Sequence, residues 1–150
     1  KSTEIDAVYI ATPHNFHLEQ AKLMIRNGKH VLVEKPITVN SRGLEELLFL
    51  AQKYKVLVME AFWTRFLPAT KKVKEIIDSK EFGKLKHIEF SFGFEIDEDY
   101  PENGRLLNPD LAGGSILDLG IYPIGTTRFF DCLIAKCVIF SFITAVVFPA

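Results

Sequence analysis

In the first 60 residues, short apolar runs alternate with segments that carry apolar side chains at helical spacing. Residues 7–10, 31–33 and 56–59 are uninterrupted apolar runs bounded by polar residues, as in strands of a buried parallel sheet. Residues 16–27 and 44–51 instead show the helical pattern. Strand, helix and strand with short joints predict βαβ units, whose strands are parallel and whose crossovers are right-handed.

The pattern changes after residue 65. Pro68 predicts the start of a helix that runs through Ile77, with a lysine-rich face in solvent. Residues 85–94 alternate polar and apolar side chains with a period of two, which predicts an antiparallel strand with one exposed face. Residues 95–108 are acidic and carry proline and glycine, a composition typical of a mobile loop over a cleft or of disorder. The chain after residue 65 is therefore predicted to form a second layer, with an antiparallel strand, that differs from the three parallel strands before it.

Composition and charge exclude several classes of protein. A chain of 150 residues that is 48% hydrophobic and 25% charged is typical of a globular protein with a sizeable core. The formal net charge of −1, with both signs interspersed, offers no basic face for nucleic acid. Cys132 and Cys137 match neither a zinc-ligand pair nor a redox pair, which favours a reducing, cytoplasmic compartment.

The end of the chain is unusually apolar. Residues 132–148 contain a single charge, Lys136, and as a helix these 17 residues would span about 25 Å against a membrane core of about 30 Å. A membrane tether is therefore marginal. Residues 138–148 are also rich in β-branched and aromatic side chains, so a buried strand or an aggregation-prone tail is the favoured interpretation.

Polar side chains collect where the first two predicted strands end. They are Thr12, His14 and Asn15 after the first strand, and Glu34, Lys35 and Pro36 after the second. Because the carboxyl ends of parallel strands open at one edge of a sheet, where ligands bind in α/β proteins, we expect these groups to lie together. No metal is expected there, because His14 and His17 lack a third ligand at suitable spacing.

A glycine-opened segment, residues 113–122, stands out further along the chain. Glycines at the start of a helix let another backbone or a ligand come close. Asp118 and Tyr122 are four residues apart and would share one helix face, so a carboxylate and a phenol would point together.

Four segments, taken in order, resemble the Gfo/Idh/MocA oxidoreductase family. They are Ala-Thr-Pro-His-Asn-Phe-His at 11–17, Glu-Lys-Pro at 34–36, Glu-Ala-Phe-Trp-Thr-Arg-Phe at 60–66, and the glycine-opened segment at 113–122. The resemblance covers about residues 5–130, and Tyr122, where many members have histidine, favours the dihydrodiol dehydrogenase branch. The chain departs from the family in having no G-x-G-x-x-G phosphate-binding turn.

The resemblance implies an α/β fold in three parts. Residues 1–64 would form an incomplete Rossmann-like parallel sheet that binds a dinucleotide, residues 65–130 the start of an α+β antiparallel-sheet domain for the substrate, and residues 131–150 a divergent apolar tail. It also implies hydride transfer to NADP, with NAD as the alternative, from a vicinal diol or an aldopyranose such as D-xylose. Complete members of the family would be homodimers.

The residues allow a chemical argument of their own. Oxidising an alcohol requires a base that takes the hydroxyl proton, while the cofactor carries the hydride. Tyr122 is the candidate base. A free phenol has a pKa of about 10, so a phenol that acts as a base near neutral pH needs a nearby cation to lower this pKa. Lys35 is the candidate cation. The Lys35 ammonium would also bind the reacting hydroxyl, Glu34 would hold the lysine stem, and Asp118 would orient the lysine or the diol.

Further site residues follow from the resemblance. It implies that Thr12, His14, Asn15, Glu34, Lys35, Pro36 and Arg65 would face the cofactor, and that His17, Trp63 and Phe92 would line the substrate side. Outside these motifs, Lys35 would be an ordinary loop lysine and Tyr122 a packing aromatic.

Two alternatives to an enzyme remain open from the sequence. The chain is either a truncated, inactive relative that serves as an interaction or dimer module, or a membrane-tethered fragment. The missing glycine-rich turn favours the module, whereas the intact Glu-Lys-Pro segment and Tyr122 favour the dehydrogenase.

Overall fold

The computed structural model describes residues 2–90, 92–93, 96–97, 99–101 and 103–130. The apolar tail at 131–150, and with it the predicted tether or strand, lies outside the described residues. The chain forms two compact units. Unit 1 comprises Lys1–Phe62 and Pro101–Asp118; unit 2 comprises Trp63–Tyr100 and the described residues from Leu119 onward. In the described residues, no helix is both long and apolar enough to cross a membrane.

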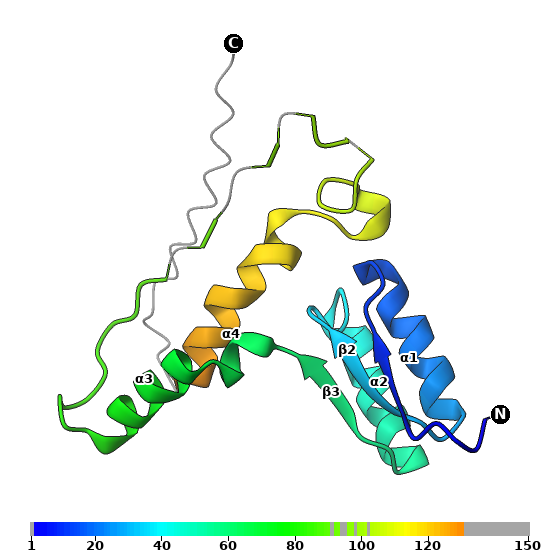
Figure 1. Ribbon diagram of the computed structural model, residues 1–150, viewed down its shortest axis with the longest axis horizontal. Coiled ribbons are helices and arrows are strands. Elements are labelled where there is room, and N and C mark those ends of the chain that lie inside the picture. Colours follow the sequence, from blue (N-terminus) through cyan, green and yellow to red (C-terminus); the bar gives the residue numbers. More distant parts are fainter. Residues whose placement is uncertain (1, 91, 94–95, 98, 102, 131–150) are drawn as a thin grey trace. The chain divides into compact units, whose positions relative to one another are not determined.

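Unit 1 is built on a three-stranded parallel sheet, which confirms the predicted α/β class. Its strands β1 (Ala7–Ile10), β2 (His30–Glu34) and β3 (Val58–Ala61) lie in the order β1-β2-β3 (Figure 1). Because all three are parallel, their carboxyl ends open at the same edge of the sheet.

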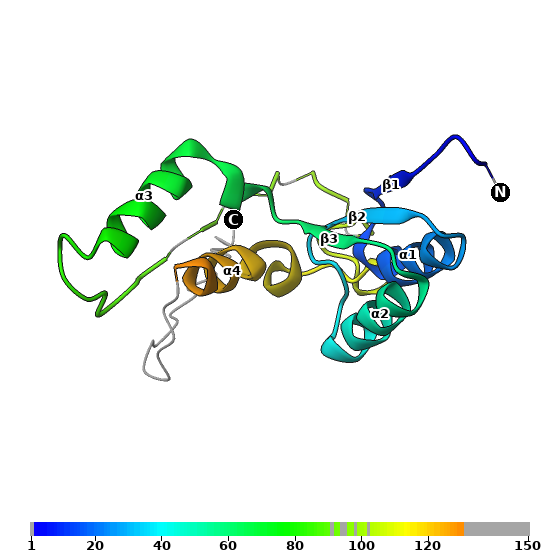
Figure 2. The ribbon, with the colours of Figure 1, turned by 90° about the horizontal axis from the view of Figure 1, so that it is seen from below.

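Two helices connect the strands and lie on the same face of the sheet, as Figures 1 and 2 show. Helix α1 (His17–Arg26) ends before Gly28, whose φ of +73° supplies the predicted left-handed stop. Helix α2 (Ser41–Tyr54) begins with the predicted cap, because the Asn40 side chain accepts a hydrogen bond of 2.8 Å from the backbone N–H of Gly43.

The core of unit 1 lies between these helices and the sheet. Side chains from one face of β1 and β2 pack against apolar positions spaced three and four residues apart on the helices. The buried members are Ile10, Val31, Val33, Ala21, Ile25, Leu47 and Leu50.

The other face of the sheet is uncovered in the described residues. Tyr9, Leu32 and Met59 are neighbours in register across the three strands, and their exposed fractions are 57%, 37% and 48%. Parallel sheets are normally covered on both faces, so this bare face is unusual.

The third strand begins two residues later than the predicted run at 56–59. Lys55 adopts a left-handed conformation with φ of +54°, and the N–H of Val56 bonds the carbonyl of Ala51, 3.1 Å away. Since the N–H of Val56 closes the end of α2, it is not available to a strand ladder, and pairing starts at Val58.

Unit 2 contains α3 (Pro68–Ser79) and α4 (Ile121–Phe129). Pro68 occupies the first turn of α3, as predicted, and the surface of this helix carries ion pairs at i+3 and i+4 spacing. The predicted regular helix at 113–122 is interrupted, because Ile116–Gly120 forms a π-helical turn before α4 begins. The boundary between the two units falls within this turn.

The predicted antiparallel strand at 85–94 is not found in the part of it that the structure describes. A strand requires a neighbour for its ladder bonds, and the described residues contain no antiparallel partner.

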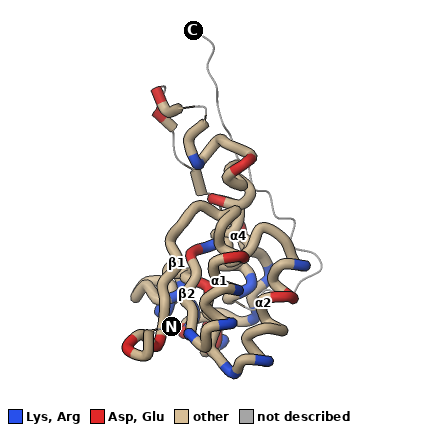
Figure 3. The backbone as a smooth tube through the Cα atoms, turned by 90° about the vertical axis from the view of Figure 1, so that its right-hand side faces the viewer, with Lys and Arg blue, Asp and Glu red and all other residues tan. Residues whose placement is uncertain are grey.

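Along the described chain, acidic and basic residues are interspersed (Figure 3).

Candidate functional site

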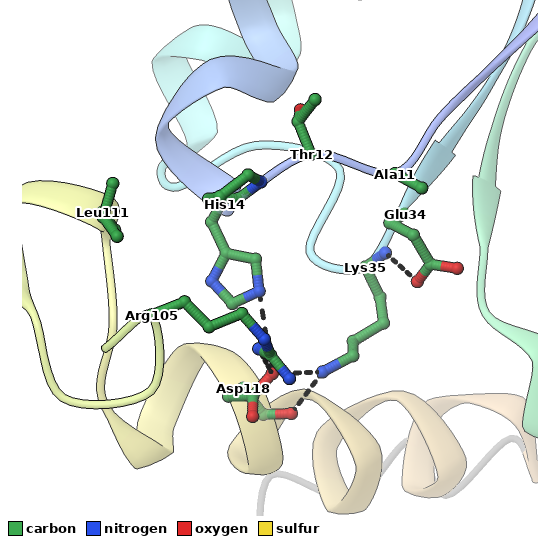
Figure 4. A pocket seen from close by; sticks show the side chains of 9 residues that line it. Ala11, Thr12, His14, Glu34, Lys35, Arg105, Leu111 and Asp118 are labelled. Carbon is green, nitrogen blue, oxygen red and sulfur yellow. Dashed lines mark hydrogen bonds and ion pairs between the residues drawn. The ribbon is translucent and has the colours of Figure 1, made fainter. Parts of the chain in front are cut away.

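A cleft of about 290 Å³ opens in unit 1 at the carboxyl ends of β1 and β2 (Figure 4). The segments that leave the two strands form one side of this cleft, and the loop that returns from residue 101 forms the other. The lining residues are Ala11, Thr12, Pro13, His14, Glu34, Lys35, Arg105, Leu111 and Asp118. The predicted polar groups at the strand ends therefore do lie together, and they meet Asp118.

A buried ion pair between Lys35 and Asp118 lies at the centre of the cleft. The Lys35 Nζ is 2.7 Å from Oδ1 of Asp118 and 2.6 Å from the backbone oxygen of the same residue. The two side chains are only 12% and 10% exposed. At such burial each charge depends on the other for compensation, so the pair holds the ammonium in one position. This geometry agrees with the prediction that Asp118 orients Lys35.

The cations around Asp118 keep it ionised. Burial is the largest single effect and alone would raise the pKa of this carboxyl group, but the hydrogen bond and the charge of Lys35 oppose it. Arg105, whose Nη1 is 3.4 Å from Oδ1, and His14 act in the same direction, so the pKa of Asp118 lies below its ordinary value. Asp118 is therefore a carboxylate at neutral pH.

His14 is buried beside this pair. Its Nδ1 is 3.0 Å from the carbonyl oxygen of Ala112, and its Nε2 is 3.7 Å from Oδ1 of Asp118. Burial is the main reason why the pKa of His14 is lowered, and the charges of Lys35 and His17 add to it, against the opposite effects of Ala112 and Asp118. The imidazole is therefore neutral at neutral pH.

The loop from Pro101 to Gly114 supplies residues that the sequence did not indicate. A Cβ atom on Gly113 would lie 2.7 Å from the backbone oxygen of Arg105, so only glycine lets the loop close on itself. Closure brings the carbonyl of Ala112 to His14, and places Arg105 against Asp118. The glycine was the one feature in the sequence that indicated such a close approach.

Asn15 anchors the same loop, since its amide donates a hydrogen bond of 2.9 Å to the carbonyl of Asp110. This contact differs from the predicted one with the cofactor. The Thr12 hydroxyl, which lines the cleft, donates to Gln20 at 2.9 Å.

Glu34, predicted to hold the stem of Lys35, bonds the backbone of that residue and a tyrosine hydroxyl. Its carboxylate accepts hydrogen bonds from the Tyr9 hydroxyl and from the backbone N–H of Lys35, the latter at 3.2 Å. The carboxylate that holds the Lys35 ammonium is that of Asp118. The prediction gave Glu34 the lysine stem and Asp118 the orientation of the lysine or the diol; in the structure Asp118 bonds the ammonium and Glu34 bonds the backbone N–H of Lys35.

His17 lies in the interior of unit 1. Its side chain is fully buried, with Nδ1 2.8 Å from the carbonyl oxygen of Pro36 and Nε2 2.8 Å from that of Thr12. The ring therefore joins the segments that leave β1 and β2, and its place on the substrate side stays a prediction. Pro36 is itself buried and contributes this carbonyl.

Unit 2 gathers the predicted aromatic residues. The indole N–H of Trp63 donates to the Tyr122 hydroxyl at 3.0 Å, and the Phe92 ring meets the Tyr122 ring edge to face, with 5.1 Å between centroids. The Arg65 guanidinium lies 5.8 Å from the centre of the Phe129 ring. Because Tyr122 and Lys35 belong to different units, their cooperation in one site stays a prediction.

Comparison with protein families decides the identity of the chain. Residues 1–62 match the oxidoreductase family described as having an NAD-binding Rossmann fold, and residues 70–132 match the GFO/IDH/MocA C-terminal domain. The chain belongs to the Gfo/Idh/MocA oxidoreductase family. The two matches follow one another in the order that the resemblance implied.

Curated relatives are 36 to 39% identical to this Gfo/Idh/MocA chain over the matched residues. D-xylose 1-dehydrogenase (NADP(+)) of Hypocrea jecorina is 36% identical over 126 residues, which are 80% of this chain and 32% of that protein. Trans-1,2-dihydrobenzene-1,2-diol dehydrogenase of Xenopus tropicalis is 36% identical over 122 residues, 81% and 36% of the two chains. The scyllo-inositol 2-dehydrogenase (NADP(+)) of Bacillus subtilis is 39% identical over 123 residues, 79% and 37%. The chain thus spans about a third of the length of these relatives.

Solved structures of oxidoreductases also match this chain. An aldose-aldose oxidoreductase from Caulobacter crescentus, complexed with glycerol, matches with a TM-score of 0.80 at 26% identity, over 87% of this chain and 38% of that one. A 3-ketoreductase from Actinomadura kijaniata, in complex with NADP and TDP-benzene, matches with a TM-score of 0.77 at 31% identity, over 87% and 39%.

The cleft fits part of a nicotinamide dinucleotide. Its volume of about 290 Å³ is at the lower end for ligand pockets, enough for the nicotinamide end and too small for a whole dinucleotide. The position at the carboxyl ends of parallel strands also fits. The turn after β1 reads Thr-Pro-His and carries no glycine, so the residues of this chain form no glycine-rich phosphate cradle there.

Proposed function

We propose that this chain is part of an NADP-dependent oxidoreductase that removes a hydride from a vicinal diol or an aldopyranose. The observation that carries the proposal is the buried Lys35–Asp118 pair in a cleft at the strand ends. An ammonium fixed in this way offers a directed hydrogen bond to a hydroxyl oxygen, which is what orienting an alcohol for oxidation requires.

The residues of the chain have distinct roles in this proposal. When bound, the nicotinamide cofactor would accept the hydride. Lys35 binds the oxygen of the reacting hydroxyl, and Asp118 holds the ammonium in place. Tyr122 takes the hydroxyl proton, and its orientation is fixed by the Trp63 N–H and the Phe92 ring. Thr12, His14 and Glu34 hold the nicotinamide end, with Arg65 on the cofactor side.

The relatives support the proposed substrate class and cofactor. Their names refer to D-xylose, a dihydrobenzenediol and scyllo-inositol, which all carry hydroxyl groups on adjacent carbons. Two of these names include NADP, and NADP is present in the 3-ketoreductase structure. These are reasons to prefer NADP to NAD, and adjacent hydroxyls to an isolated alcohol.

An NADPH fluorescence titration tests the cofactor part of the proposal. This chain is compared with a version extended by the N-terminal strands of a relative. We expect the extended version to bind NADPH and to reduce NADP with D-xylose. Binding by this chain as well would mean that the strand-end residues alone hold the nicotinamide end. An extended version that binds no NADPH would contradict the proposal.

Two substitutions in the extended version test the catalytic part. We expect Lys35→Met and Tyr122→Phe each to lower kcat/KM for D-xylose by about 100-fold or more, as removal of a general acid or base does. Lys72→Met, on the exposed face of α3, is the control and is expected to keep full turnover. If both site variants keep the turnover and pH profile of the parent, the residue assignment is wrong.

A second candidate function is favoured by the bare sheet face. The exposed apolar side chains of Tyr9, Leu32 and Met59 suit a protein contact, so the chain would act as an interaction module. The same titration separates the two functions, because a module of this kind has no requirement for NADPH.

A further inference from the structure

The two ring nitrogens of His14 are chemically different. Nδ1 lies 3.0 Å from the carbonyl oxygen of Ala112, and a carbonyl oxygen can only accept a hydrogen bond. Nδ1 must therefore carry the hydrogen. In a neutral imidazole this leaves Nε2 without one, as an acceptor. Burial of the ring, which lowers the pKa of His14, favours this neutral form.

The Nε2 atom of His14 faces a second acceptor. Oδ1 of Asp118 is 3.7 Å away, beyond hydrogen-bond distance, and Asp118 is ionised. Figure 4 shows the imidazole ring pointing toward the Asp118 carboxylate, with the Lys35 ammonium next to this carboxylate. Two acceptors that face each other leave a position where a hydrogen-bond donor is favoured.

We propose that His14 is a specificity-determining residue whose Nε2 accepts a hydrogen bond from a ligand in the cleft. The proposal rests on the proposed function and adds a requirement to it, namely that the ligand group at this position carries an O–H or N–H. Two sources would satisfy this requirement: a hydroxyl of the substrate and the carboxamide of the nicotinamide.

The charged neighbours of His14 make this requirement selective. Lys35 and Arg105 are donors, and Asp118 and His14 are acceptors, while His17 is occupied by two backbone carbonyls. A hydroxyl at this position can donate to Nε2 of His14. An ether oxygen has no hydrogen to donate and leaves the buried Nε2 without a partner, which costs affinity.

Nitrogen NMR of the 150-residue chain tests the proposal directly. The chain has four histidines, so each ring is assignable in a long-range 1H–15N spectrum. At pH 7.5 we expect Nδ1 of His14 to be protonated and Nε2 to be unprotonated. The probes are NADP+, trans-cyclohexane-1,2-diol, and the dimethyl ether of this diol, which has the same ring and no donor.

The diol and its ether distinguish the two sources of the donor. A shift of the Nε2 signal on adding the diol, absent with the dimethyl ether, identifies a substrate hydroxyl. A shift with NADP+ alone identifies the carboxamide. A different tautomer in the free chain, or equal responses to the diol and the ether, overturns the proposal.

Two substitutions separate the role of Nε2 as an acceptor from the hydrogen bond between Nδ1 and the carbonyl of Ala112. In His14→Asn, the amide nitrogen replaces Nδ1 and keeps the bond to Ala112, but nothing replaces Nε2. In His14→Gln, the amide reaches the position of Nε2 and presents an oxygen there. We expect His14→Asn to weaken binding of the responding probe about tenfold or more, the factor that corresponds to one lost hydrogen bond, and His14→Gln to retain most of it. His87→Asn, on an exposed histidine, is the matched control and should bind as the parent does.

The outcomes also separate this proposal from the proposed function. Equal binding by His14→Asn and the parent overturns the role of His14 while the oxidoreductase proposal stands. The same spectra are recorded on the version extended by the N-terminal strands of a relative. An extended version in which no signal of Lys35, Asp118 or His14 responds to any probe contradicts both, because the cleft then binds neither cofactor nor diol.

Discussion

At the scale of single residues, the Lys35–Asp118 pair controls the stability of the cleft. Lys35→Met leaves a carboxylate that is only 10% exposed without its main partner, so we expect unit 1 to lose about 3 kcal/mol of unfolding free energy. Urea unfolding followed by circular dichroism measures this change. Lys72→Met is the control, because its pair with Glu75 is 71% and 67% exposed and should contribute under about 1 kcal/mol. Equal effects of the two variants would mean that the Lys35–Asp118 pair is solvated.

The pH dependence of stability follows from two groups whose pKa is lowered in the folded chain. Below the ordinary pKa of 6.5, the unfolded chain protonates His14 more readily than the folded chain does, so the unfolding free energy falls as the pH decreases. Asp118 adds a second decrease that begins below its ordinary pKa of 3.8. Urea unfolding between pH 3 and 8 should show both steps.

The variant His14→Asn should remove the step that begins near pH 6.5, and Asp118→Asn the step below pH 3.8. Stability that rises as the pH falls from 7 to 5 in the parent would contradict the direction given for His14.

The sequence indicated which residue types form the site, but it did not indicate which histidine faces the cleft. His14 and His17 are three residues apart, and both follow the first strand. Their orientations are set by the 3₁₀ turn His14–Phe16 that precedes α1, and by the carbonyl of Pro36, which comes from the next strand end. Such contacts between distant segments leave no local pattern, whereas Lys35 at the end of a buried strand does.

At the scale of elements, the loop from Pro101 to Gly114 completes the cleft through Gly113. A methyl group at this position would lie 2.7 Å from the oxygen of Arg105 and 2.9 Å from that of Asn108, both backbone atoms that have little room to move. We expect Gly113→Ala to cost about 1 to 3 kcal/mol, as overpacking does, and to break the bond between His14 and Ala112. Urea unfolding and the His14 Nδ1 signal measure the two effects.

Gly93→Ala is the matched control for this loop, because a Cβ atom there meets nothing within 4 Å. It should leave both measurements unchanged. Retention of the His14 signal in Gly113→Ala would mean that the loop has another way to close.

Elements with a strong local pattern were predicted well, and elements that depend on distant partners were not. The three parallel strands and the helices α1, α2 and α3 follow from apolar periodicity, caps and a proline. The predicted strand at 85–94 has the right alternation but no partner in the described residues. The contact of Asp118 with Lys35 was expected from the sequence, but the contacts of Ala112 with His14 and of Asp110 with Asn15 were not indicated, because they span more than 90 residues.

At the scale of the whole molecule, the sheet has one covered and one bare face in the described residues. Parallel sheets are normally covered on both faces, and the side chains of Tyr9, Leu32 and Met59 leave this face open to a partner. Because the strand order is β1-β2-β3, each connection moves across the sheet in the same direction. Right-handed crossovers then place α1 and α2 on the same face of the sheet. The asymmetry is therefore a consequence of strand order, and the apolar side chains on the bare face need another cover.

Substitutions on opposite faces of the sheet test this asymmetry. We expect the double variant Leu32→Thr/Met59→Thr, on the bare face, to change the unfolding free energy by under about 1 kcal/mol, because these side chains are 37% and 48% exposed. Val33→Thr, next to Leu32 on the covered face and fully buried, should cost about 1 to 3 kcal/mol, because it places a hydroxyl in the core.

The bare face should also determine self-association. An apolar stripe across three strands favours contact between copies of the chain, so sedimentation velocity of the parent should show concentration-dependent association. The double variant should reduce this association, since threonine keeps the strand propensity and removes most of the apolar surface. If the double variant is as destabilised as Val33→Thr and associates like the parent, Leu32 and Met59 are already covered within one chain. The face would then contribute to the core of the folded chain and would not be a surface for other structure.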